Sequence, residues 1–143
     1  MEKYLNPALS PVERAEDLLA KMSLEEKMGQ VVGYFPKGFG ETEQLREKLP
    51  HGVGNVSCLE MRSLTSFEEI VKFQRETQET IMELNEHHIP AIFHMEGLCG
   101  AFLLNATSFP AGIGRASSFD PELEEQIGRM VARQEQAVGI TQD

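Results

Sequence analysis

Residues 89–100 read IPAIFHMEGLCG, and this stretch decides the fold of the chain. The apolar run at 91–93 has the length and bulk of a β-strand that is buried on both faces. The run ends at Glu96, and Gly97 and Gly100 then break it into a loop. Because parallel α/β sheets hold ligands at the carboxyl ends of their strands, Glu96 is the first candidate for a binding residue.

A second strand and a long helix precede this stretch. Residues 53–59 (VGNVSCL) predict the first strand, although Gly54 is unfavourable inside a strand. Ser66 and Glu69 form a capping pattern that opens a helix running to about residue 85, with apolar side chains at helical spacing. Residues 89–96 form the second strand. Strand, helix and strand make a βαβ unit, which predicts parallel strands and a right-handed crossover.

The segments before residue 53 are mostly helical in pattern. Ser10 and Ser23 each begin a capping pattern, so two short helices follow them in succession. We expect a loop over 33–40, a brief polar helix over 41–49 and a turn at 50–52.

The segments after residue 96 lead towards a further strand. Residues 97–118 predict a loop, and Asp120 opens a last helix that runs to about residue 138. Gly139 is a favourable helix stop, and residues 140–141 look like the start of a third strand.

These elements predict an α/β fold with a helical lead-in at 1–52 and a βαβα segment at 53–143. Two strands and an unfinished third are fewer than the roughly five or six of a typical sheet. We therefore expect the chain to be the N-terminal part of a longer protein.

Composition restricts the classes of function. The chain of 143 residues has the size of one domain, with 13 basic against 23 acidic residues and a net charge of −10, which disfavours nucleic acid as a partner. No apolar run approaches the roughly 20 residues of a membrane span, and the N-terminus lacks a signal peptide. Cys58 and Cys99 are too few for a disulfide framework, so we expect a cytoplasmic protein. Because the sequence contains no membrane span, we also expect no membrane partner.

Several residues have alternative interpretations. Glu96 either grips a polar ligand or is an exposed acid paired with an arginine. His94 and Glu96 share a strand face and, with Cys99 or Cys58, suggest a metal set, but no CxxC or HExxH spacing is present and we predict no metal.

Two further features favour structural roles. His87 and His88 stand at a helix end, where imidazoles interact favourably with helix carbonyl groups. Cys99 has no identifiable base, so a buried thiol is favoured over a nucleophile. The residues alone leave the chemistry open.

Five segments match the motifs of one family in order. Residues 22–30 resemble "MSLEEKIGQ", 52–56 resemble a first barrel strand, and 89–100 resemble "IPxLFHEExLHG". Residues 107–123 follow "TxFPxxIGLAAT(W/F)DPEL", and 135–140 are similar to "EARAxGI". Together they resemble the N-terminal part of the catalytic barrel of the glycoside hydrolases of family 3, of the β-glucosidase and β-xylosidase type.

This resemblance implies the beginning of a (β/α)₈ TIM barrel, a carbohydrate substrate, no cofactor, and retaining hydrolysis by two carboxylates. The family's nucleophile and acid/base lie beyond the matched motifs, so no catalytic residue is assigned here. In the family, an acid at the end of the second strand binds the sugar. The resemblance assigns this role to Glu96, which is a glutamate where aspartate is common. We expect its longer reach to favour a sugar ring without an exocyclic CH₂OH group. Cys99 stands where the family usually has histidine.

The leading hypothesis is the N-terminal segment of a retaining exo-β-glycosidase, a β-xylosidase or β-glucosidase that is inactive without its remaining parts. It would act on terminal non-reducing sugars of β-linked saccharides. The alternatives are a non-enzymatic sugar-binding or interaction module and another TIM-barrel enzyme such as an aldolase or isomerase. Because bare strand edges invite pairing, we also expect the chain to self-associate.

Overall fold

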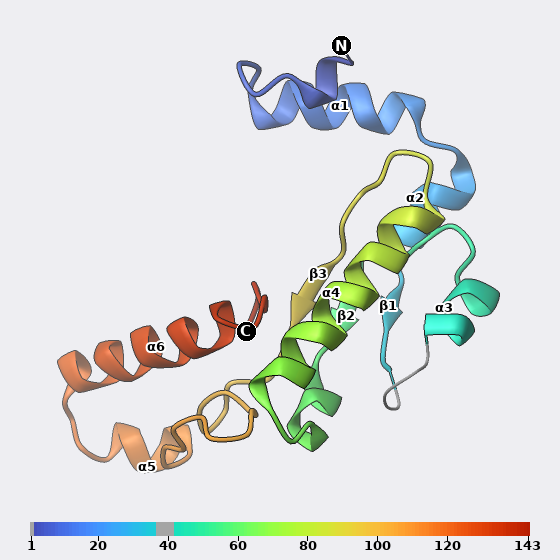
Figure 1. Cartoon of the computed structure of the whole chain (residues 1–143). Helices are drawn as coiled ribbons and strands as arrows, with labels where there is room; N and C mark the ends of the chain where they lie inside the picture. The colour runs from blue at the N-terminus through green and yellow to red at the C-terminus, as the bar shows by residue number, and fades with distance from the viewer. Residues whose placement is uncertain (1, 37–41) are drawn as a thin grey trace.

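The computed structural model describes residues 2–36 and 42–143 of the chain (Figure 1). Within them, three parallel strands form one sheet in the order β1 (Gly33–Tyr34), β2 (Asn55–Ser57) and β3 (Ile92–His94). The α/β class expected from the sequence is confirmed. Parallel strands joined through helices are the arrangement of part of a TIM barrel.

Helices make up most of the remaining structure. They are η1 (Lys3–Leu5), α1 (Pro11–Lys21), α2 (Leu24–Gln30), α3 (Thr42–Lys48), η2 (Leu59–Ser63), α4 (Phe67–Leu84), α5 (Gly112–Ala116) and α6 (Pro121–Gln136). The three capping patterns of the sequence are present as reciprocal hydrogen bonds at the starts of α1, α2 and α4. Among the described residues, no helix combines the length and apolar character needed to cross a membrane.

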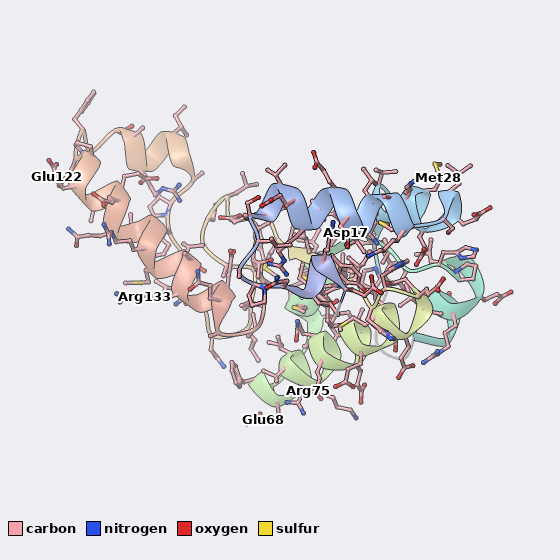
Figure 2. The ribbon with its side chains drawn as sticks, turned by 90° about the horizontal axis from the view of Figure 1, so that it is seen from above. Asp17, Met28, Glu68, Arg75, Glu122 and Arg133 are labelled. Carbon is pink, nitrogen blue, oxygen red and sulfur yellow. The ribbon has the colours of Figure 1, made fainter. Side chains whose placement is uncertain are left out.

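Helix α4 is the crossover between β2 and β3, and it runs alongside the sheet (Figure 1). Val56 and Phe93, opposite each other in the two strands, are 0% and 1% exposed and belong to the same core cluster as Ile70 and Ile81 of α4. The Gln78 side chain adds polar contacts, since it donates to the Ala91 carbonyl at 3.0 Å and accepts from the Ala91 amide at 2.9 Å. The outer side of α4 carries Glu68 and Arg75, which point away from the sheet (Figure 2).

The described residues cover one face of the strands and leave the other face open, whereas the sequence predicts strands apolar enough to be covered on both faces in a closed barrel. Ile92 in β3 remains 47% exposed, while Phe93 beside it is buried. The physical reason is that α4 supplies cover on one side only. Self-association of the chain stays a prediction.

Two short elements occur where the sequence predicts loops. The predicted loop at 33–40 begins with β1, and its residues 37–40, like Glu41 of the predicted helix, lie outside the described residues. Strand β1 has two residues and is recognisable only through its pairing with β2, which no local pattern reveals. Helix α5 lies inside the predicted loop 97–118, and it has no side-chain cap that could have marked it.

The strands are also shorter than predicted. Strand β2 occupies 55–57 of the predicted 53–59, and β3 occupies 92–94 of the predicted 89–96. The third predicted strand contributes one parallel bridge, between His94 and Gln142. The Thr141 amide donates to the Phe93 carbonyl at 3.0 Å, so this end of the chain lies on the β3 side of the sheet.

Gly54 lies just before β2, where two backbone segments touch. Its amide donates to the Gly29 carbonyl of α2 at 2.9 Å, and a Cβ at this position would lie 1.9 Å from the Gln30 carbonyl oxygen. The glycine that weakened the strand pattern therefore permits the close approach of α2 to the sheet.

We predict that Gly54→Ala destabilises the chain, because the backbone of α2 must move to admit a methyl group. The expected loss is about 1–3 kcal/mol in the free energy of unfolding, the usual cost of overpacking. Urea denaturation followed by circular dichroism measures it.

Gly128→Ala on α6 is the matched control, because a Cβ there would meet no atom within 4 Å. It should stabilise the chain by about 0.5–1 kcal/mol through the gain in helix propensity. A Gly54→Ala variant as stable as wild type would show that α2 does not pack against this segment.

Candidate functional site

The carboxyl ends of β2 and β3 lie level with each other. Ser57 is opposite His94 in the parallel register, and the Cys58 amide donates to the His94 carbonyl at 2.7 Å. One residue further on, the Met95 amide donates to the Gln142 carbonyl at 3.0 Å. Residues that follow the strands are therefore presented together at one edge of the sheet, where barrel enzymes bind their substrates.

Glu96 lies at this edge on the uncovered side of the sheet. Burial alternates along the strand, with Phe93 and Met95 buried at 1% and 3%, and with Ile92 and Glu96 exposed. His94, on the same side as Glu96, is half-buried. Among the described residues the Glu96 carboxylate makes no hydrogen bond or ion pair, so the structure does not contain the alternative arrangement in which an arginine neutralises it. Both carboxylate oxygens are free to accept hydrogen bonds from a ligand.

The glycines after Glu96 are required by close approaches. A Cβ at Gly97 would lie 2.0 Å from an oxygen of the Asp143 carboxylate. Gly100 has a φ of +101°, which favours glycine, and a Cβ there would lie 2.3 Å from the Thr107 carbonyl oxygen. The loop that the sequence predicts after Glu96 thus folds back closely on itself, and the Phe109 amide donates to the Cys99 carbonyl at 2.8 Å.

The structure does not assemble the metal set considered from the sequence. Over residues 2–36 and 42–143, no group of three or more His, Cys, Asp or Glu side chains is placed to hold a metal ion. Cys58 and Cys99 are both free thiols. Burial raises the pKa of Cys58 to about 12, and the negative charge of Glu135 adds to the effect. Cys58 is therefore a neutral thiol at physiological pH. Cys99, for which the sequence favours a buried thiol, is only partly buried.

The paired histidines both make contacts within the fold, but only His88 meets a helix carbonyl group as the sequence predicts. His88 Nδ1 lies 2.9 Å from the Met82 carbonyl oxygen in the last turn of α4. His87 Nδ1 lies 3.0 Å from Glu26 Oε1, and its ring meets the Tyr4 ring edge-on with centroids 6.0 Å apart. These contacts join the N-terminal helices to the end of α4.

Glu26 is a buried acid that the sequence marked only as a capping residue. Its burial alone would raise its pKa, but hydrogen bonds from His87, the Ser23 amide and the Glu86 amide outweigh the burial and lower it. The carboxylate therefore stays charged inside the protein. It caps α2 and at the same time holds a segment 60 residues away.

Glu135, near the end of α6, is the opposite case. It is 3% exposed, and its Oε1 has no hydrogen-bond partner among the described residues. Burial raises its pKa to about 7, and the nearby negative charge of Asp143 contributes. Glu135 is the first residue of the motif at 135–140, but the sequence does not predict its burial. A helical acid next to a glutamine normally faces solvent.

Comparison with known proteins gives consistent matches. The family model of the glycosyl hydrolase family 3 N terminal domain matches residues 23–143. A protein of Formosa agariphila named "Putative beta-xylosidase" is 31% identical over 96% of this chain. The solved structure of a β-glucosidase from Erythrobacter marinus superposes with a TM-score of 0.85 over 98% of this chain, at 23% identity. The chain spans 19% of the length of each of these two proteins.

We predict that Glu135 makes the stability of the chain depend on pH. Its folded pKa of about 7 lies above its ordinary value of 4.5, so the folded state binds the proton more tightly than the unfolded state. The stabilisation is complete below pH 4.5 and is lost as the pH rises through 7. Glu135→Gln should remove this loss and exceed wild type at pH 8 by about 1–3 kcal/mol, the cost of an unsatisfied buried group.

Urea denaturation at pH 5 and pH 8 measures the effect. Glu122→Gln removes a charge from the exposed first turn of the same helix, where the side chain points to solvent, and should leave the loss between the two pH values in place (Figure 2). Equal stability of wild type and Glu135→Gln at pH 8 would contradict the prediction.

Proposed function

Because the chain belongs to glycosyl hydrolase family 3, we propose that it forms the beginning of the catalytic barrel of a retaining exo-β-glycosidase. The substrate class is β-linked saccharides, from which a β-xylosidase or β-glucosidase removes the terminal non-reducing sugar. The names of the two similar proteins support these two sugars, since one is a β-xylosidase by name and the other a β-glucosidase.

The observation that carries the proposal is the exposed carboxylate of Glu96 at the carboxyl end of β3. Glu26, a buried acid close to the sheet, has internal partners, whereas the oxygens of Glu96 accept no hydrogen bond within the described residues. A sugar ring offers adjacent hydroxyl groups that can donate to both oxygens of one carboxylate. Such charged hydrogen bonds are short and directional, so they fix the ring as well as bind it.

In this mechanism Glu96 binds and orients, and other residues do the chemistry. Retaining hydrolysis uses one carboxylate as nucleophile and a second as acid and then base, through a covalent glycosyl-enzyme intermediate. The family motifs matched here contain neither group, so both belong to other parts of the whole protein. Holding the ring at Glu96 keeps the sugar bound through contacts that are made both before and during the reaction, so these contacts lower KM.

The length of the side chain bears on the choice of sugar. A glutamate reaches one methylene further from the strand than the aspartate common in the family. The bound ring then lies further from the sheet edge, and we infer that a pentose without an exocyclic CH₂OH group fits better than a hexose. This favours β-xylosides over β-glucosides.

Three further inferences concern the whole protein. We infer that residues 1–52 form a lead-in to a barrel segment at 53–143, and that strand β1 of the lead-in extends the sheet of this segment by pairing with β2. The free Cys58 and Cys99 fit a reducing compartment, which supports a cytoplasmic location. The uncovered sheet face and strand edges favour self-association of the chain when it is produced alone.

We predict that the purified chain hydrolyses no glycoside, while the full-length gene product hydrolyses β-glycosides. A panel of p-nitrophenyl β-glycosides tests both proteins side by side, with xyloside turned over faster than glucoside by the full-length protein. Turnover by the chain alone would contradict the prediction that it is inactive, provided that an inhibitor control excludes a contaminating glycosidase. A full-length product inactive on every β-glycoside would contradict the proposed function.

We predict that Glu96→Gln in the full-length protein lowers kcat/KM by the equivalent of about 1.5–3 kcal/mol, the value of a hydrogen bond to a charged group. Glu86→Gln is the matched control, because this exposed acid precedes β3 at the opposite end of the sheet. Circular dichroism should show the same fold in both variants. Unchanged kinetics for Glu96→Gln would show that the carboxylate does not touch the substrate.

A further inference from the structure

Arg115 in α5 connects three segments that lie apart in the sequence. Its Nη1 donates to the Leu98 carbonyl at 3.3 Å and to the Pro110 carbonyl at 3.4 Å. Its Nε donates to Glu124 in the first part of α6 at 3.0 Å, and its Nη2 lies 2.9 Å from the same carboxylate. The guanidinium therefore joins the beginning and the end of the loop that follows Glu96 to the start of α6.

The burial of this group indicates that the carbonyl contacts matter more than the ion pair. The side chain of Arg115 is 16% exposed, whereas that of Glu124 is 49% exposed. A half-exposed ion pair contributes little, because water and salt screen it. The fixed fork of an arginine makes these four contacts from three separate nitrogens, whereas a lysine has three N–H donors on one nitrogen.

These contacts bear directly on Glu96. On its N-terminal side, the Met95 amide is bonded to the Gln142 carbonyl in the sheet. On its C-terminal side, Leu98 is held by Arg115. The bond from the Phe109 amide to the Cys99 carbonyl stays within the loop and does not tie the loop to a helix. Further along the loop, Thr107 is bonded to Gln134 of α6, its amide donating at 3.3 Å and its hydroxyl accepting at 3.0 Å. Arg115 supplies the helix anchor nearest the exposed carboxylate, because Leu98 lies two residues after Glu96.

We propose that Arg115 is a positioning residue for the substrate site: it holds the 97–110 loop so that Glu96 keeps its place at the sheet edge. This inference rests on the proposed function, since it gives Glu96 its role as the sugar-binding acid. It predicts that loss of Arg115 weakens substrate binding through Glu96 while the chemical step continues unchanged.

The kinetic test uses the full-length protein and the p-nitrophenyl β-glycoside that it hydrolyses fastest. Arg115→Met should raise KM about fivefold to tenfold and leave kcat within about twofold, the pattern of lost binding. Arg115→Lys should fall between the two, because a lysine keeps the charge but reaches fewer acceptors. Arg129→Met is the matched control, since it breaks the exposed ion pair with Glu125 in α6, at 2.5 Å, and touches no loop carbonyl. It should leave both constants unchanged.

The double variant separates positioning from general stability. If Arg115 acts through Glu96, then Arg115→Met should cost about twofold or less once Glu96→Gln is present, because the interaction it supports is already gone. Additive losses, or a lower kcat with unchanged KM, would overturn the proposal.

Amide hydrogen exchange tests the same proposal without activity. In the unliganded full-length protein, Arg115→Met should speed exchange across 97–110 at least severalfold, while Arg129→Met should not. Unchanged exchange in this loop would overturn the positioning role. If the wild-type protein hydrolyses no β-glycoside, the proposed function fails. In that case, faster amide exchange in the 97–110 loop of Arg115→Met would still support the role of Arg115 as a loop anchor. Unchanged exchange would reject the loop anchor as well.

Discussion

The parallel pairing of β2 with β3 is the constraint on which the rest of the structure depends. Parallel neighbours cannot be joined by a tight turn, so the chain between them must cross over, and it does so as the 18-residue helix α4. The crossover brings Val56 and Phe93 together under α4 as the centre of the apolar core. It also puts the carboxyl ends of both strands at one edge. The position of Glu96 is thus a consequence of strand direction before it is a matter of any single contact.

The two buried acids show how much hydrogen bonding decides the state of a carboxylate. Glu26 and Glu135 are 4% and 3% exposed, yet the pKa of the first is lowered and that of the second is raised. Donors from Ser23, Glu86 and His87 surround the first, so its charge stabilises the junction between the N-terminal helices and α4. One oxygen of the second has no donor, so its charge opposes folding above neutral pH. Similar burial therefore has opposite consequences.

The sequence predicted those features whose causes are local. Capping pairs such as Ser66 and Glu69 bond within four residues, so the starts of α1, α2 and α4 were predictable, and so was the parallel class of the sheet. Strand β1 was missed because it exists only through β2, and Gly54 was misjudged because its reason is the α2 backbone. Glu96 could be proposed as a binding residue because it ends an apolar run. Arg115 could not, since it bonds to carbonyl oxygens that every residue carries, and only the folded loop shows which ones.

An acid that binds a ligand must differ from one that supports the fold in what its oxygens already contact. The oxygens of Glu13 and Glu69 accept bonds from their own helix starts, and that of Glu124 is held by Arg115. Such acids cannot grip a sugar without first losing a bond that stabilises the chain. Glu96 has no such bond among the described residues, and its backbone is held on both sides instead. Because the backbone is already fixed, little main-chain entropy is lost when a ligand binds. Because the side chain has no partner among the described residues, its full hydrogen-bonding capacity remains for the ligand. In the proposed site, the anchoring of this loop is therefore as important as the carboxylate itself.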